Sequence, residues 1–148
     1  APAARSKVAQ LMNDKSIAAH VRFANAQKVE SSGDLLSAVR EYQKIVAEYA
    51  QDIAALRAQK QIQTIRTDPD LSAAYTTQLQ QDADVKAPPL IRMAKQCISA
   101  TEQVADAERK AGLRPNARRW LGTVVNDFPG TTYETEARAL LATLGDPQ

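Results

Sequence analysis

The chain has 148 residues, which is enough for one domain with a buried core. Charged residues make up 24% of it and the net charge is +2, so the composition excludes a disordered tail and gives no reason to expect nucleic acid as a partner. Gly is scarce, aromatic residues are only 5%, and Ala, Gln, Glu, Lys and Arg abound, a bias that favours helix along nearly the whole chain.

The first third of the chain predicts helices separated by short polar breaks. Residues 1–16 form an N-terminal extension, in which Val8, Leu11 and Met12 have helical spacing, and a helix is expected over 17–31. Whether 3–31 is one bent helix or two is left open. Gly33 ends this helix, because glycine readily adopts the left-handed conformation, and Asp34 can cap the next helix.

Two further helices follow Gly33. The apolar residues of the first recur at three- and four-residue steps: Leu35, Ala38, Tyr42, Ile45, Val46 and Tyr49. Residues 50–52 break it, and Asp52 can cap a helix over 53–66. The expected buried residues of that helix are Leu56, Ala58, Ile62 and Ile65.

The middle of the chain predicts a short helix, a turn and a long helix. Asp68 and Pro69 are a typical helix start, and Pro88-Pro89 predicts a turn, because a residue that precedes proline avoids the helical conformation. A long helix is expected over about 89–111 and closed by Gly112. Cys97 lies in the middle of its apolar stripe, and we interpret it as a core thiol rather than a reactive one.

The last third predicts a helix from Pro115, a break at Pro129-Gly130, and a final helix that ends at Gly145. Thr131 and Glu134 have the spacing of a capping box. The expected buried residues of the two helices are Ala117, Trp120, Leu121, Val124, Val125 and Phe128, then Ala137, Leu140, Leu141 and Leu144. In total we expect an all-α fold of about seven helices.

One segment of the sequence is repeated at a constant offset, which places Gly33 on Gly112. Each copy reads as a glycine, a helix, a short break and a second helix. The positions that carry the repeat are Gly33, Ala38, Tyr42 and Tyr49 in the first copy, and Gly112, Ala117, Leu121, Phe128 and Pro129 in the second. Each helix pair has an apolar face too wide to bury alone, so the pairs are expected to stack.

These repeat positions resemble the tetratricopeptide repeat, whose copies are about 34 residues apart. The Phe128-Pro129-Gly130 break is similar to that of bacterial extracytoplasmic members, such as the outer-membrane assembly lipoprotein and the Tol–Pal coordinator. The resemblance implies antiparallel helical hairpins stacked as a short solenoid that binds other proteins and has no catalytic residues. The larger spacing here implies extra helices between the copies.

On this basis residues 1–148 are expected to form a single helical domain. Within it, 1–16 is the N-terminal extension, 17–66 the first repeat-like unit with the helix after it, 67–88 a connecting helix and turn, and 89–145 the second unit with a capping helix. The resemblance also implies a soluble protein in the periplasm or elsewhere outside the bacterial cytoplasm.

The sequence predicts no enzyme, cofactor or metal. It contains one histidine, His20, and one cysteine, Cys97, too few for a zinc site of the usual kind. No glycine-rich phosphate loop occurs, since the five glycines are scattered singly. No run of about 18 apolar residues exists that could span a membrane.

Two functions from different classes remain. The first is a protein-binding or scaffolding module, for which the resemblance places a partner on the first helix of each unit: His20, Phe23, Gln27, Glu102, Asp106 and Lys110. Phe23 is either an exposed anchor for the partner or packs beneath the N-terminal helix. The second is a helical spacer or C-terminal appendage of a larger secreted protein, suggested by the linker-like start Ala1-Pro2-Ala3-Ala4. The oligomeric state is left open.

Overall fold

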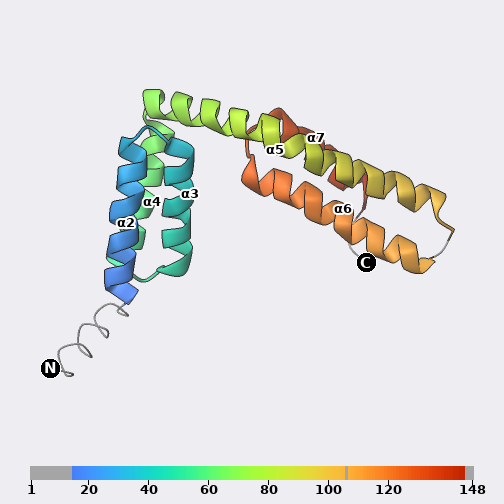
Figure 1. Cartoon of the computed structure of the whole chain (residues 1–148), viewed down its shortest axis with the longest axis horizontal. Coiled ribbons are helices and arrows are strands. Elements are labelled where there is room, and N and C mark those ends of the chain that lie inside the picture. Colours follow the sequence, from blue (N-terminus) through green and yellow to red (C-terminus); the bar gives the residue numbers. More distant parts are fainter. Residues whose placement is uncertain (1–14, 106, 146–148) are drawn as a thin grey trace, which may run out of the picture. The chain divides into compact units, whose positions relative to one another are not determined.

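A computed structural model describes residues 15–105 and 107–145 and contains, within these ranges, six helices and no strand (Figure 1). They are α2 (Lys15–Ser31), α3 (Leu35–Glu48), α4 (Ile53–Thr67), α5 (Pro69–Gln103), α6 (Ala107–Asp127) and α7 (Thr132–Thr143). The predicted all-α fold of antiparallel helical hairpins is therefore confirmed, with six helices in the described part instead of about seven. Val8, Leu11 and Met12 of the N-terminal extension lie outside the described residues, as does the choice between one helix and two for 3–31.

The chain divides into two compact units at the Gln78–Leu79 bond, which lies inside α5. Unit 1 holds α2, α3, α4 and the start of α5, and unit 2 holds the rest of α5 with α6 and α7.

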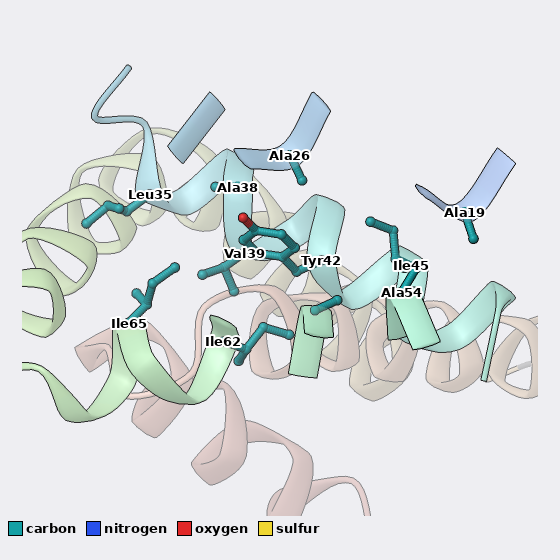
Figure 2. Close-up of a cluster of buried hydrophobic side chains, with 11 residues drawn as sticks. Ala19, Ala26, Leu35, Ala38, Val39, Tyr42, Ile45, Ala54, Ile62 and Ile65 are labelled. Atoms are coloured by element: carbon teal, nitrogen blue, oxygen red, sulfur yellow. The ribbon is translucent and has the colours of Figure 1, made fainter. Parts of the chain in front are cut away.

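The core of unit 1 lies between α2, α3 and α4, and Tyr42 is its largest fully buried side chain (Figure 2). α3 packs against both α2 and α4. The buried residues that gather here are Ala19, Ala26, Leu35, Ala38, Val39, Tyr42, Ile45, Ala54, Ala58, Ile62 and Ile65. Because α3 reverses the chain direction between two short turns, α2 and α4 point the same way and contact each other along one side of α3.

The turn between α2 and α3 is built as the sequence predicts. Gly33 has a φ of 89°, a backbone conformation that residues with a Cβ atom rarely adopt. The Asp34 side chain accepts a hydrogen bond from the Ser37 backbone N–H at 3.0 Å and so caps α3. The Gln78 amide then joins both sides of the turn: it donates to the Gly33 carbonyl at 2.7 Å and accepts from the Leu36 N–H at 3.0 Å.

Ala38 and Ala117 are each at most 1% exposed, so both methyl groups are closely surrounded. We expect Ala38→Leu and Ala117→Leu each to lower the free energy of unfolding by about 1–3 kcal/mol through overpacking. Denaturant unfolding measures this, and Ala47→Leu, at an exposed alanine of α3, is the control expected to change stability by less than about 0.5 kcal/mol. Equal stability of all three variants would contradict the close helix contact at these alanines.

The buried side of α4 differs from the sequence prediction. Leu56 is 64% exposed, whereas Ala54, Ala55 and Ala58 are buried together with Ile62 and Ile65. The prediction of Leu56 in the core was therefore wrong. Ala55, Ala58, Ile62 and Ile65 recur at three- and four-residue steps and form one buried stripe, and Leu56 lies outside it.

The predicted turn at Pro88-Pro89 was also wrong, since α5 continues through both prolines. The missing proline N–H groups leave the carbonyls of Asp84 and Val85 without helical partners. Both residues are exposed, so water can hydrate these carbonyls. This lowers the energetic cost of the two prolines, and packing on either side of them stabilises the continuous helix.

The long helix does not end at Gly112 as predicted. α5 ends at Gln103, where the Thr101 hydroxyl donates to the carbonyls of Cys97 and Ile98, and Gly112 and Pro115 both lie inside α6. A glycine within a helix costs only about 1 kcal/mol relative to alanine, so a preference of that size does not decide where a packed helix stops.

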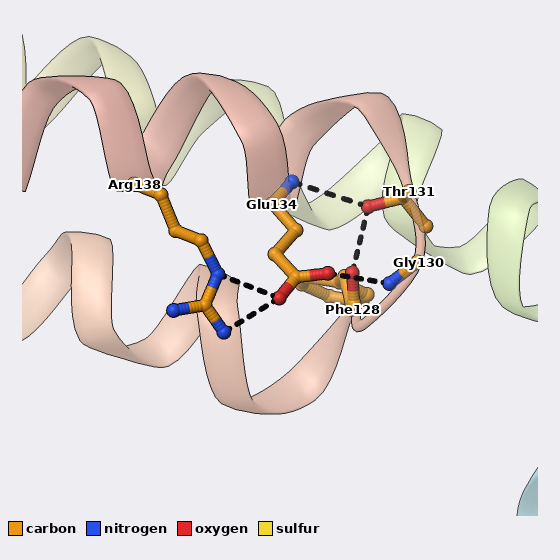
Figure 3. Close-up of polar contacts among 5 residues, drawn as sticks. All are labelled: Phe128, Gly130, Thr131, Glu134 and Arg138. Atoms are coloured by element: carbon orange, nitrogen blue, oxygen red, sulfur yellow. Dashed lines mark hydrogen bonds and ion pairs between the residues drawn. The ribbon is translucent and has the colours of Figure 1, made fainter.

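In unit 2 the turn between α6 and α7 follows the sequence prediction (Figure 3). Thr131 caps α7: its Oγ1 accepts from the Glu134 N–H at 3.3 Å and donates to the Phe128 carbonyl at 2.7 Å. The Glu134 carboxylate in turn accepts from the Gly130 N–H at 2.6 Å and from Arg138 at 2.8 Å. α7 is followed by Gly145, whose φ of 70° is consistent with the predicted stop.

The Gly130 N–H, with a further contribution from Arg138, lowers the pKa of Glu134. A lowered folded-state pKa means that this carboxylate stabilises the fold above its unfolded-state pKa and that the contribution is lost as the pH falls through the folded value. An NMR titration of Glu134 is expected to have its midpoint below that of a model peptide. Arg138→Gln should raise this midpoint only partly, because the larger cause remains. A midpoint at or above the peptide value would contradict the bond to Gly130.

Two of the paired positions of the sequence repeat have similar environments in the two units, whereas Gly33 lies in a turn and Gly112 inside α6. Ala38 and Ala117, and likewise Tyr42 and Leu121, are buried on α3 and α6 respectively. The last aromatic pair differs, because Phe128 is buried and Tyr49 is half-buried beneath the Arg22 guanidinium, which lies 5.8 Å from its ring.

Candidate functional site

An open groove with a volume of about 500 Å³ runs between α2 and α4 in unit 1. We call it the α2/α4 groove. Its lining residues are His20, Phe23, Ala24 and Gln27 from α2 and Arg57, Lys60 and Gln61 from α4. The residues of each helix recur at three- and four-residue steps, so each helix contributes one continuous stripe, beside the stripe that it buries in the core.

Phe23 forms the link between the groove and the core. Its side chain is half-buried, and its ring centroid lies 5.5 Å from that of Tyr42 with the planes tilted by 45°. One side of the ring therefore packs on the core while Phe23 still lines the groove. Phe23 is therefore neither fully exposed nor fully buried, and the alternative in which it packs beneath the N-terminal helix lies outside the described residues.

A partly buried polar bridge joins the three helices around the groove. The Glu30 carboxylate of α2 accepts from the Tyr42 hydroxyl of α3 at 2.7 Å and from the Gln61 amide of α4, also at 2.7 Å. Burial, together with the neighbouring Glu30, raises the pKa of Tyr42 well above its usual range. The phenol therefore remains a donor at neutral pH, and Gln61 is held in place in the groove wall.

The charges that line the α2/α4 groove are positive. Arg57 and Lys60 are exposed, no carboxylate is among the described lining residues, and neither cation forms an ion pair within the described part of the chain. The groove thus presents two cations on one helical stripe, one turn apart.

His20 stands at the end of the groove nearest the start of α4. Its Nδ1 lies 2.8 Å from the Ser16 carbonyl, which can only accept, so this nitrogen carries the proton. The same nitrogen lies 3.8 Å from Asp52, the N-cap residue of α4. The Ala54 N–H is the largest cause that lowers the pKa of Asp52, followed by Ser16, and His20 adds a smaller contribution.

Unit 2 contains a comparable groove of about 590 Å³ between α5 and α7. The lining residues are Pro88, Ile91, Arg92, Lys95, Gln96, Ser99, Ala100 and Gln103 from α5, with Tyr133 and Glu136 from α7. Lys95 forms an ion pair with Glu136 across this groove at 2.6 Å. Burial and a hydrogen bond with Asp84 raise the pKa of Tyr133. Lys95, Glu136 and Tyr133 of this groove therefore already interact with other residues of the chain.

The first helix of unit 1 has a counterpart in α5, but not at the offset that places Gly33 on Gly112. The fully buried Ala87 and Ala94 match Ala19 and Ala26 of α2 at a smaller constant offset. In the same register, four groove residues of α5 fall on groove residues of α2: Pro88, Ile91, Arg92 and Lys95. The two offsets differ because the hairpin of unit 2 is longer, since α6 has 21 residues and α3 has 14.

Of the six residues predicted to bind a partner, the structure brings three together. His20, Phe23 and Gln27 line the α2/α4 groove. Glu102 is exposed in the last turn of α5 and lines neither groove described above, while Asp106 and the side chain of Lys110 lie outside the described residues. Because α5 ends at Gln103, the three residues predicted for unit 2 do not share one helix as expected.

Sequence reasoning missed Arg57, Lys60 and Gln61. The available signal was their helical spacing, which places them on one stripe of α4 next to Leu56. Helical spacing alone does not show which helix lies opposite this stripe, so the sequence did not identify it as a groove wall.

Elsewhere the structure offers little chemistry. Cys97 is half-buried, and within residues 15–105 and 107–145 no three His, Cys, Asp or Glu side chains gather as metal ligands. In the described part of the chain no helix combines the length and apolar character needed to cross a membrane. Comparison of the chain with known protein families, curated proteins and solved structures gives no significant match.

Proposed function

We propose that the chain is a non-catalytic protein-binding module of tetratricopeptide type, and that the α2/α4 groove receives a segment of its partner. The observation that supports this most directly is the gathering of His20, Phe23 and Gln27, the residues that the resemblance implies, with Arg57, Lys60 and Gln61 in one open groove. Phe23, partly exposed in the groove and packed against Tyr42, is a suitable anchor for a partner side chain, since a packed ring loses little conformational entropy when it is covered.

The proposal extends to the setting of the protein. The resemblance to extracytoplasmic bacterial proteins suggests a scaffold of the bacterial envelope, acting in the periplasm. The alternative function, a helical spacer of a larger secreted protein, is favoured by one observation: a single 35-residue helix, α5, belongs to both units. A spacer needs no occupied groove, so a binding experiment separates the two functions.

The experiment is selection of a displayed random peptide library on the purified chain, followed by measurement of binding for the selected peptides. Ala24→Trp is the blocking variant, because Ala24 is an exposed residue of α2 that lines the groove, and a tryptophan there fills the groove from outside the core. Ala73→Trp, at an exposed alanine of α5 in unit 1 that does not line the groove, is the matched control.

We expect micromolar or tighter peptides from the selection and at least a tenfold loss of affinity in Ala24→Trp but not in Ala73→Trp. Circular dichroism would check that both variants keep the helical content of the parent. Absence of any enriched peptide, or equal binding by the two variants, would overturn the groove as the binding site and favour the spacer.

A further inference from the structure

We infer that the α2/α4 groove takes an acidic peptide segment with a bulky aliphatic residue at one end. The inference rests on the proposed function and adds the chemistry and the orientation of the ligand. It depends on the distribution of charge and of exposed apolar side chains along the two helices that form the groove.

Two carboxylates beside the groove, those of Glu30 and Asp52, already accept hydrogen bonds from other residues of unit 1. Both oxygens of Glu30 accept hydrogen bonds, one from Tyr42 and one from Gln61. Asp52 accepts from the Ala54 N–H at 2.7 Å and faces His20. Neither acid forms an ion pair with Arg57 or Lys60, the two cations on the groove wall, so carboxylates of a ligand are the complementary groups.

Exposed aliphatic side chains lie at the end of the groove near the start of α4, away from Lys60. Ile17 is 41% exposed and stands one turn before His20, and Ile53 is 60% exposed and stands one turn before Arg57. Side chains one turn apart on a helix are neighbours on its surface, so both isoleucines continue the groove stripes of their helices. They lie at the same end, because His20 of α2 approaches Asp52 at the start of α4.

Ile17 and Ile53 thus give this end of the groove an apolar character, and a leucine or isoleucine of the ligand that covers them would remove apolar surface from water. The groove is thus apolar at one end and basic further along α4.

The spacing of these features sets the spacing within the ligand. Ile53 and Lys60 are seven residues apart on α4, which at 1.5 Å per residue is about 10 Å along the helix axis. An extended chain covers about 3.3 Å per residue, so the aliphatic residue and the most distant carboxylate should stand about three positions apart in the ligand.

The test is the composition of library peptides selected on the parent chain and on the variant Arg57→Glu/Lys60→Glu. The parent should enrich Asp and Glu about three positions from Leu, Ile, Val or Phe, and the variant should enrich Lys and Arg there instead. Peptides selected on the parent should lose about tenfold or more in affinity for the variant and should weaken as salt is raised, because exposed charge pairs are screened. The single variant Arg57→Glu is compared with Arg66→Glu, a matched charge reversal at an exposed site of α4 that does not line the groove.

Ile53→Ser tests the apolar end, since an exposed side chain can change there without loss of the core. It should reduce the affinity of the selected peptides severalfold and remove the preference for the aliphatic residue. Neutral or basic peptides, an affinity independent of salt, or equal effects of Arg57→Glu and Arg66→Glu would overturn the inference. If such peptides are still blocked by Ala24→Trp, only the ligand chemistry fails. If no peptide is enriched at all, the proposed function fails as well.

Discussion

Tyr42→Ala is expected to lower the free energy of unfolding by about 3–5 kcal/mol. Tyr42 is fully buried, and its ring contacts Phe23 while its hydroxyl donates to Glu30. Truncation leaves a cavity at the centre of three helices and removes one of the two donors to a partly buried carboxylate. Denaturant unfolding followed by circular dichroism measures the loss, which is a large share of the stability of an ordinary domain.

Two further variants separate the causes. Tyr42→Phe keeps the ring and removes only the hydrogen bond to Glu30, so it should cost less, about 1.5–3 kcal/mol. Leu121→Ala makes the cavity at the corresponding repeat position of unit 2, where the side chain has no hydroxyl, and should cost about 2–5 kcal/mol. A Tyr42→Phe variant as stable as the parent would show that the bridge through Glu30 contributes nothing to stability.

Phe128→Ala is expected to destabilise the chain by about 3–5 kcal/mol, because its side chain is only 2% exposed at the end of α6. The cavity would lie directly before the turn in which the Phe128 carbonyl accepts from Thr131. Trp120, the only tryptophan of the sequence, lies on the same helix, so its fluorescence during unfolding reports on unit 2.

The repeat supplies a matched control for Phe128→Ala. Tyr49 occupies the corresponding place after α3 but is half-buried, with Arg22 above its ring. Tyr49→Ala should therefore cost markedly less than Phe128→Ala, about 1–2 kcal/mol, since less apolar surface returns to water. Equal losses would mean that sequence equivalence, rather than the observed burial, sets the energy at these two positions.

The chemistry of turns was predictable because it depends on a few neighbouring residues. Gly33 adopts a positive φ, and Asp34, Asp52, Asp68 and Thr131 each accept from a backbone N–H at the start of a helix. Such caps need no information from distant parts of the chain, because donor and acceptor are separated by two or three residues.

The signals from Pro88-Pro89 and Gly112 failed for a common reason. Each describes a local cost of about 1 kcal/mol for glycine and about 3 kcal/mol for proline in a helix, which packing can exceed. Ala83, Ala87, Ile91 and Ala94 bury one continuous side of α5 through the proline pair, and the helix is kept. The local energetic cost of one residue does not determine where a helix ends when the residues before and after it are buried by one continuous helix.

The candidate site was predictable in part. The tetratricopeptide resemblance implied that His20, Phe23 and Gln27 line one surface, and they do share a groove. Arg57 and Lys60 could not be assigned to it from the sequence, because which helix lies opposite α2 depends on the packing of α3 between them. The half-buried state of Phe23 likewise depends on the position of Tyr42 in another helix.

The all-helical fold, the caps, the glycine turn at Gly33 and the repeated apolar stripes could all be derived from the residues alone, because they follow from the helix period and from short-range hydrogen bonding. Three other outcomes required the packing of whole helices: α5 continues past its prolines, Leu56 is exposed, and Arg57 and Lys60 share a groove with His20 and Phe23. They depend on the apolar surface that helices bury against one another, a quantity that no short stretch of sequence contains.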